Sequence, residues 1–330
     1  MRQHSAAFAN FICKFGDKNL LDYAEEVVIP AFTRDTYVRS FGDRTHYHFY
    51  EVELLNLAEE GKYPIWVLAG RFIKDTELRR EQIFDEEKGL IKDEQSMRSA
   101  PSAFFILILN NHRLIYFPET AHAPDLSAFK STVRDFLKRR HKEYIDELYE
   151  ALKKKAERVT KKALFETHPW PHLEVVPLTG KSDITAFIRR FETLRKIEFR
   201  VVRPNDDINA GEILNEVRQL SNALASQNTK LTVASPDGLD KEAAIEAVTE
   251  ATSTGNQDVN VSGIDGEGNR LVGNNEKFNL TAPMDTVPPT KRALIAKLFG
   301  MFTGLNADGT INAPPANQQS DKVTNLSERL

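Results

Sequence analysis

Strand-like patterns of apolar and polar residues dominate the first third of the chain. They occupy an alternating segment at 45–52, a candidate strand pair around Gly70 at 63–73, and a continuously apolar segment at 103–109. Alternation is typical of a half-buried strand, and a short apolar run indicates a buried one. Asn110 and Asn111 predict a turn into a returning strand over 112–117, because Asn tolerates positive φ. We therefore expect a β-rich N-terminal domain over residues 1–123.

Charged residues interrupt this pattern, and helical spacing follows it. Residues 76–95 are crowded with Glu, Asp, Lys and Arg, which predicts a solvated helix or an excursion from the sheet. From Asp125 to Leu164, apolar residues recur at helical spacing, so we expect one long helix or two in series. Two prolines within 168–171 end this segment. Residues 124–168 are thus expected to form a long basic helical connector.

Strand-like and helix-like segments alternate beyond the two prolines. Expected strands lie at 172–178, 197–202 and 230–234, expected helices at 183–194, 210–225 and 240–252, and a hairpin at 258–264 and 270–280. Strands separated by helices need crossover connections, so residues 169–283 predict an α/β sandwich of ferredoxin-like type that ends in a β-hairpin. Residues 284–330 are expected to hold a short amphipathic helix and a polar tail that is disordered unless a partner orders it. The expected fold class is α+β.

Composition narrows the class of protein. A chain of 330 residues is longer than one core usually spans, and 41% hydrophobic with 28% charged residues is ordinary for a globular protein. The longest apolar run is too short to cross a bilayer. The single cysteine, Cys13, has no partner for an intrachain disulfide and is expected in the core. These features favour a cytoplasmic protein without membrane contact.

Motifs that would identify a reaction are incomplete. Gly180-Lys181-Ser182 stands between an expected strand and helix, as in a phosphate-binding loop, but Val175 occupies the place of the loop's first glycine. A helix N-cap at Ser182 or Asp183 accounts for the same residues. The chain also has no nucleophile elbow and no dinucleotide glycine fingerprint. We therefore expect no cofactor, assign no catalytic residue and lean away from an enzyme, although a triad assembled across the fold stays open.

Two histidines form a weak candidate for a metal site. His46 and His48 are two residues apart on an expected strand, so both side chains would share one face. A metal could bind there if another histidine or a carboxylate joined them. Paired histidines on a half-exposed strand are more often ordinary surface residues.

Clustered cations between residues 138 and 162 are the main electrostatic feature. The candidate nucleic-acid-binding residues are Lys138, Arg139, Arg140, Lys142, Lys153, Lys154, Lys155, Arg158, Lys161 and Lys162. Such a density of cations can neutralise several phosphates and release their counterions. Acidic residues are interleaved with them, however, and opposite charges at helical spacing are typical of a solvated helix. Both interpretations remain open at this point.

The order of these features resembles uncharacterised bacterial proteins encoded in phage-defence and abortive-infection loci. The resemblance is carried by Gly70 after an apolar strand, the acidic excursion, the hairpin at Asn111 to Leu114, the basic helix, and Leu239-Asp240 before a Gly-spaced hairpin. It implies a non-catalytic component of an anti-phage defence system that acts through nucleic-acid or protein binding. DNA or RNA and a protein encoded nearby are the implied partners. No catalytic residue is carried over.

Two further functions are alternatives. One is a metal-dependent nuclease or nucleotide-processing enzyme whose acid and base residues are dispersed over both regions. The other is a homo-oligomeric scaffold that assembles through the edge of the second-region sheet and through an apolar helix face near the C-terminus. That face comprises Leu294, Ile295, Leu298, Phe299 and Phe302.

Overall fold

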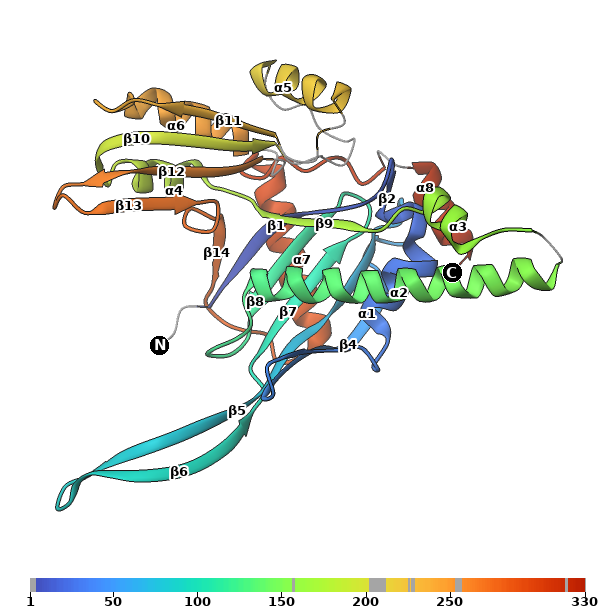
Figure 1. Cartoon of the computed structure of the whole chain (residues 1–330), viewed down its shortest axis with the longest axis horizontal. Coiled ribbons are helices and arrows are strands. Elements are labelled where there is room, and N and C mark those ends of the chain that lie inside the picture. Colours follow the sequence, from blue (N-terminus) through green and yellow to red (C-terminus); the bar gives the residue numbers. More distant parts are fainter. Residues whose placement is uncertain are drawn as a thin grey trace.

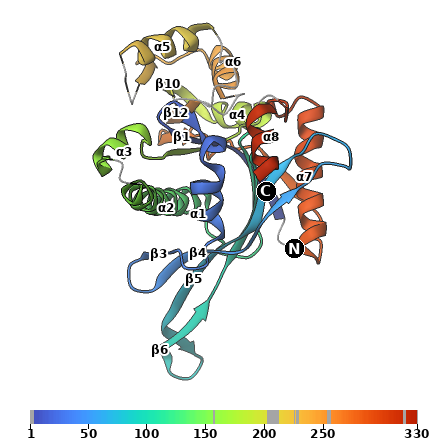
Figure 2. The ribbon, with the colours of Figure 1, turned by 90° about the vertical axis from the view of Figure 1, so that its right-hand side faces the viewer.

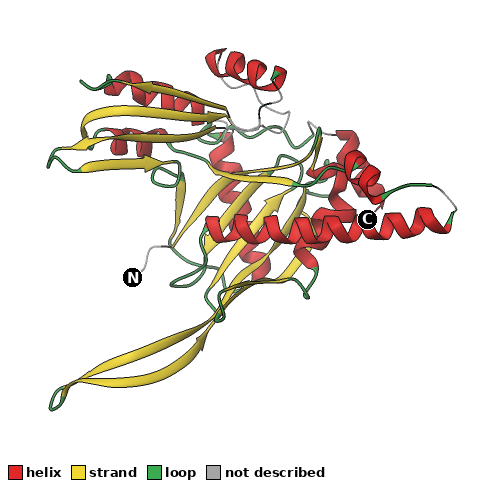
Figure 3. Ribbon diagram, viewed as in Figure 1, coloured by secondary structure: helices red, strands yellow, loops and turns green. Residues whose placement is uncertain are grey.

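The computed structural model describes residues 4–155, 158–201, 212–224, 226, 229–252, 257–317 and 320–329. These residues form a ten-stranded sheet and a separate four-stranded sheet, with antiparallel pairing throughout (Figure 1). Helices pack on both, so the chain is a mixed α/β protein (Figure 3). No helix within the described ranges is long and apolar enough to span a bilayer.

The larger sheet, called the main sheet here, draws on both ends of the chain. Its strands are β1 (His4–Phe15), β2 (Lys18–Asn19), β3 (Val38–Phe41), β4 (Thr45–Asn56), β5 (Trp66–Asp85), β6 (Gly89–Ser99), β7 (Ser102–Ile108), β8 (Arg113–Pro118), β9 (His172–Pro177) and β14 (Thr281–Met284). The order is β14-β1-β8-β7-β5-β4-β3, with β2 and β9 also paired to β1 and β6 to β5.

Strand β1 has partners along both of its edges. β8 pairs with it on one edge, from Ala7 to Asn10. The other edge is shared, because β14 pairs with His4–Ala7 and β9 with Ala9–Lys14. A backbone hydrogen bond from Leu280 to Leu178 (2.7 Å) joins the ends of the two strands. The segment between β9 and β14 is therefore an insertion whose two ends meet on one edge of β1.

Both faces of the central strands are buried, which explains the continuously apolar run at 103–109. Phe105 and Leu107 of β7 belong to one core, and Phe104 and Ile106 belong to the other. The first core is covered by a 3₁₀ turn (Leu20–Tyr23), a π-helical turn (Ala24–Val28), α1 (Ile29–Thr33), α2 (Leu126–Lys154) and α8 (Ser320–Arg329). The second is covered by α7 (Lys291–Ala307), on the opposite side of the sheet (Figure 2). The predicted β7–β8 hairpin is confirmed.

Buried aromatic rings attach α2 to the main sheet. Phe129 contacts the rings of Phe49, Phe72, Phe105 and Tyr116, with centroids 5.3–5.8 Å apart. The helix begins after its predicted cap, where the Asp125 carboxylate accepts a hydrogen bond from the backbone N–H of Ala128 (2.7 Å). The segment 124–168 is therefore two helices, α2 and the short α3 (Lys161–Thr167), and α2 is part of the first core rather than a connector.

The insertion between β9 and β14 forms the smaller sheet, called the inserted domain here. Its elements are α4 (Lys181–Ile188), β10 (Phe191–Val201), α5 (Glu212–Ala223), β11 (Thr229–Ala234), α6 (Lys241–Thr252), β12 (Gln257–Asp265) and β13 (Arg270–Asn274). Strand order is β11-β10-β12-β13. Because α6 links β11 to β12 across β10, one expected crossover is present. The element order α-β-α-β-α-β-β nevertheless differs from the β-α-β-β-α-β of ferredoxin-like folds. The strand expected at 172–178 is β9, so the boundary lies after Pro177 instead of at residue 169.

The charged segment at 76–95 is neither a helix nor a loop. Beyond Thr76 the long strand β5 pairs only with β6. The first pair of this ladder is Thr76 with Ser99, and the last is Asp85 with Gly89. The two strands form a hairpin that projects away from the rest of the chain (Figures 1 and 3). Of the two structures expected for this segment, the excursion from the sheet is the one observed. The strand pair expected at residues 63–73 is wrong, because these residues lead into and begin the single strand β5.

The C-terminal segment packs onto the chain itself. The apolar face expected to mediate assembly is buried against the main sheet: Leu298 is fully buried and Phe302 contacts the ring of Phe8. Val323 and Leu326 of α8 are buried in the first core. The described part of the expected polar tail is therefore ordered by the chain's own core, and the face proposed for oligomers is occupied.

Gly70 lies where β4 bulges toward β5. The register of β4 shifts between Tyr50 and Glu53, and Glu51 has a left-handed φ of 51°. A Cβ at Gly70 would lie 2.7 Å from the Cα of Val52. This distance is too short for two carbon atoms, and the Cα of Val52 could move away only if the backbone of β4 shifted. The bulge therefore requires glycine at this position.

We expect Gly70→Ala to lower the free energy of unfolding by about 1–3 kcal/mol, because the added methyl group overpacks the bulge. The matched control is Gly300→Ala in α7, where nothing lies within 4 Å of an added Cβ. That change should leave stability equal or raise it by up to about 1 kcal/mol, since Ala favours helix. Urea unfolding of both variants measures the difference, and equal stabilities would contradict the bulge argument.

Candidate nucleic-acid interface

Cations follow one line along the outer side of α2. They are spaced four residues apart and comprise Lys130, Arg134, Lys138 and Lys142. Four residues are slightly more than one helical turn and rise by about 6 Å, so these side chains stand in a slowly winding row. Lys138 and Lys142 are exposed. Lys130 and Arg134 contact β9, so only the second half of the row is free to bind a ligand.

The structure divides the ten predicted cations into two groups. Seven are exposed and form no ion pair with any residue that the structure describes: Lys138, Lys142, Lys153, Lys154, Lys155, Arg158 and Lys162. The other three are paired on the protein itself. Arg139 binds Asp135 (2.6 Å), and Lys161 binds Asp146 (2.5 Å).

Arg140 is the clearest correction to the predicted surface. Its side chain is buried and binds both carboxylate oxygens of Glu147 (2.6 and 2.9 Å), while its Nε–H donates to the carbonyl of Glu26 (2.7 Å). The hydrogen bond from Arg140 lowers the pKa of Glu147. A bidentate guanidinium with a third bond to backbone is a structural contact, so Arg140 does not belong to the interface.

An exposed tryptophan lies beside the free cations. Trp170 is 46% exposed and stacks on Phe165, with centroids 4.7 Å apart and an interplanar angle of 18°. Its ring also lies 5.1 Å from that of His141. Because His141 lies between Lys138 and Lys142 in the sequence, Trp170 contacts the turn of α2 that carries both lysines, at the buried His141. The sequence interpretation treated Trp170 only as part of a helix-ending segment.

His141 is held in a neutral state by its surroundings. Its side chain is buried among Phe15, Phe165 and Trp170. Burial lowers the pKa of His141 to about 4, outweighing the opposing effect of the backbone of His168. His141 therefore packs against Trp170 as an uncharged ring at neutral pH.

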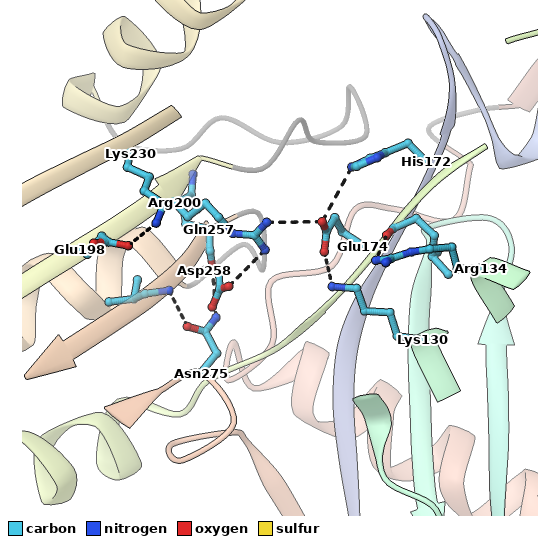
Figure 4. A network of polar contacts seen from close by, with 12 residues as sticks. Lys130, Arg134, His172, Glu174, Glu198, Arg200, Lys230, Gln257, Asp258 and Asn275 are labelled. Carbon is cyan, nitrogen blue, oxygen red and sulfur yellow. Dashed lines mark hydrogen bonds and ion pairs between the residues drawn. The ribbon is translucent and has the colours of Figure 1, made fainter. Parts of the chain in front are cut away.

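Glu174 joins α2 to the inserted domain (Figure 4). This buried β9 carboxylate accepts hydrogen bonds from Lys130 and from Arg200 of β10 (3.4 Å). Arg200 also binds Asp258 of β12 (3.2 Å). A small polar cavity of about 120 Å³ lies beside these residues, lined in part by Glu276.

The charges of this junction neutralise one another. Burial disfavours the ionised form of Glu174, but the hydrogen bond from Lys130 and the charges of Lys130 and Arg200 outweigh it and lower the pKa. Each cation is therefore matched by a carboxylate, which makes the junction a clamp between sheets and not a phosphate site.

The two histidines suggested as metal ligands lie on β4 as expected. His46 stands opposite Asp75 of β5, and its Nδ1 is 3.1 Å from the Ser40 hydroxyl. His48 is partly buried, and burial lowers its pKa. Within the described residues, no group of three or more His, Cys, Asp or Glu side chains is arranged to hold a metal ion. The motif at Gly180 begins α4 with Gly180 itself as the N-cap.

We expect Glu174→Gln to lower the free energy of unfolding by about 1–3 kcal/mol, because Lys130 loses its counter-charge and Arg200 keeps only Asp258. Glu276→Gln, an exposed change at the same cavity, should shift it by less than about 0.5 kcal/mol. Since the pKa of Glu174 is lowered, the wild-type advantage should be present above the ordinary Glu pKa and disappear as the pH falls through the lowered value. Urea unfolding between pH 7 and pH 3 tests this, and an unchanged difference across the range would refute it.

His141 predicts a second pH dependence. The unfolded chain binds a proton near the ordinary pKa of 6.5 and the folded chain only near 4. His141 therefore favours folding fully above pH 6.5, and this contribution decreases as the pH falls toward 4. His141→Phe should reduce the loss of stability between pH 7 and pH 5 without abolishing it, because the pKa values of His168 and His172 are also lowered. Thermal unfolding at both pH values measures the loss, and an equal loss in variant and wild type would exclude this role.

Comparison with known proteins places the chain in a family. Curated proteins give no match. A family model described as a domain of unknown function, DUF4747, matches residues 46–286. The match extends from β4 to β14 and so includes most of the main sheet, α2 and the whole inserted domain. Because it covers well over half of the sequence, the chain belongs to the DUF4747 family.

Proposed function

We propose that this protein binds nucleic acid without catalysing a reaction on it, through the outer side of α2 and the basic segment that follows. The observation that carries the proposal is the set of seven exposed cations that form no ion pair with any described residue. Cations that are not matched on the protein release counterions when they meet phosphates, which favours binding.

The acidic residues interleaved with these cations are committed elsewhere. Glu143 binds Arg34 and accepts a hydrogen bond from the hydroxyl of Tyr37 (2.6 Å). Glu147 binds Arg140, and Asp146 binds Lys161. These carboxylates therefore do not neutralise Lys138 or Lys142. The interpretation as a uniformly ion-paired helix therefore applies to part of α2 and not to Lys138 and Lys142.

The arrangement of the cations favours a linear polyanion over a compact anion. They extend along α2 and continue through Lys153–Lys155 and Arg158 to the start of α3. A phosphate backbone presents charges at regular intervals along a line, and such contacts position a protein without reading sequence. The chain as a whole has a net charge of −4, so the positive charge is local to this surface.

The biological setting stays a prediction from the resemblance to proteins of phage-defence loci. In that setting we propose an accessory role, with DNA or RNA and a protein encoded nearby as partners. The alternative of a metal-dependent nuclease has no support from the described residues, which bring no metal-ligand cluster together. Plaque formation on cells that carry or lack the gene, together with its neighbouring genes, would test this setting.

Binding to DNA and RNA across a salt series tests the proposed function. Lys138→Glu with Lys142→Glu should weaken binding at least tenfold at low salt and reduce the slope of log K against log salt by about 2, since two phosphate contacts are lost. The control is Arg292→Glu with Lys297→Glu, which reverses two exposed cations on α7, across the main sheet. Equal effects of the two pairs, or a binding constant that does not respond to salt, would refute the proposal.

A further inference from the structure

We propose that the nucleic acid bound here is single-stranded and that Trp170 is the platform on which an unpaired base stacks. This inference rests on the proposed function and names the ligand class for the same surface. It depends on the position and accessibility of one ring, independently of the count of cations. Base stacking on an aromatic ring is tolerant of sequence, because every base has a π-face.

Trp170 has a ring surface available for stacking. Phe165 covers one side of the indole in a nearly parallel arrangement. The residue as a whole is still 46% exposed, so it keeps contact with water beside the stacked Phe165. Tryptophan is enriched at binding interfaces because it combines a large apolar ring with a polar N–H, which suits the half-exposed Trp170 to base stacking.

The backbone around Trp170 is held in place before any ligand arrives. Pro169 and Pro171 flank it, and each fixes its own φ. Pro169 packs closely over Gly16, where an added Cβ would lie 3.0 Å from its ring, and Pro171 is buried. A hydrogen bond between the Tyr23 hydroxyl and His168 Nδ1 (2.9 Å) fixes the preceding residue. A preorganised ring loses little conformational freedom on binding.

Exposed cations stand on both helices that contact this ring. Lys138 precedes His141 by three residues, about one turn, and Lys142 is the next residue along α2; the indole contacts His141 itself. Lys162 is one turn before Phe165 on α3, and Phe165 stacks on the indole. A strand whose phosphates contact these lysines could turn a base onto Trp170. A duplex could use the lysines but not the ring, because its bases are already stacked on each other.

Tryptophan fluorescence reports on the platform directly. The only other tryptophan in the sequence, Trp66, begins β5 in the main sheet and donates its Nε1–H to the hydroxyl of Ser327 in α8 (2.8 Å). In a Trp66→Phe background, emission therefore comes from Trp170 alone. We expect a thymidine strand of about 16 nucleotides to quench this emission at saturation, and a duplex of equal length to leave it nearly unchanged.

Affinity measurements provide the second part of the test. Trp170→Ala should weaken single-strand binding about tenfold, leave duplex binding unchanged and keep the salt slope, because no phosphate contact is lost. Trp170→Phe should restore most of the affinity, since a phenyl ring still stacks. The Phe variant also keeps a ring on Phe165, so it tests the inference even if the Ala variant unfolds.

The possible results separate the two proposals. If Trp170→Ala and Trp170→Phe bind both ligands like the wild type while the paired lysine reversals weaken binding, the surface binds nucleic acid and the stacking inference is wrong. If Trp170→Ala weakens single strand and duplex equally, the preference for single strands is wrong. If the lysine reversals have no effect on either ligand, the proposed function itself fails.

Discussion

The pairing of β1 along both edges is the constraint on which the rest of the structure depends. β8 occupies one edge, and β9 and β14 share the other. Because β9 lies beside β1, its Glu174 reaches Lys130 of α2, and the inserted domain begins and ends against the main sheet. The position of the inserted domain, the clamp at Glu174 and the placement of Trp170 just before β9 all follow from this shared edge.

The orientation of α2 follows from the aromatic core and decides which charges reach solvent. Phe129 and its ring contacts fix one side of the helix, which directs Lys138 and Lys142 outward and Arg140 inward. The family match at residues 46–286 contains this helix but excludes β1 and α7. The boundaries of the family match therefore differ from those of the folded structure. The matched segment lacks β1, which pairs along both edges in the main sheet, and α7, which covers one face of that sheet.

Local patterns predict local structure here, and distant contacts decide the remainder. The β7–β8 hairpin is predictable because its apolar strands and turn are contiguous. Residues 172–177 are recognisable as a strand, but their partner β1 is distant in sequence, so no local signal assigns them to the main sheet. Composition identifies the cations of the candidate site, whereas the burial of Arg140 depends on a carbonyl 114 residues away. Lys130 and Arg134 could have been added to the candidate site from the sequence, because each is spaced four residues from the next cation in the series that ends with Lys138 and Lys142.

The shared edge of β1 also has a consequence for the order of synthesis. β1 (His4–Phe15) is synthesised long before β14 (Thr281–Met284), which completes its edge. At about 5–20 residues per second, this apolar strand waits roughly 15–50 s for its last partner. An incomplete sheet edge of this kind can pair with other nascent chains, so production of this protein should depend on chaperones that shield extended segments during translation.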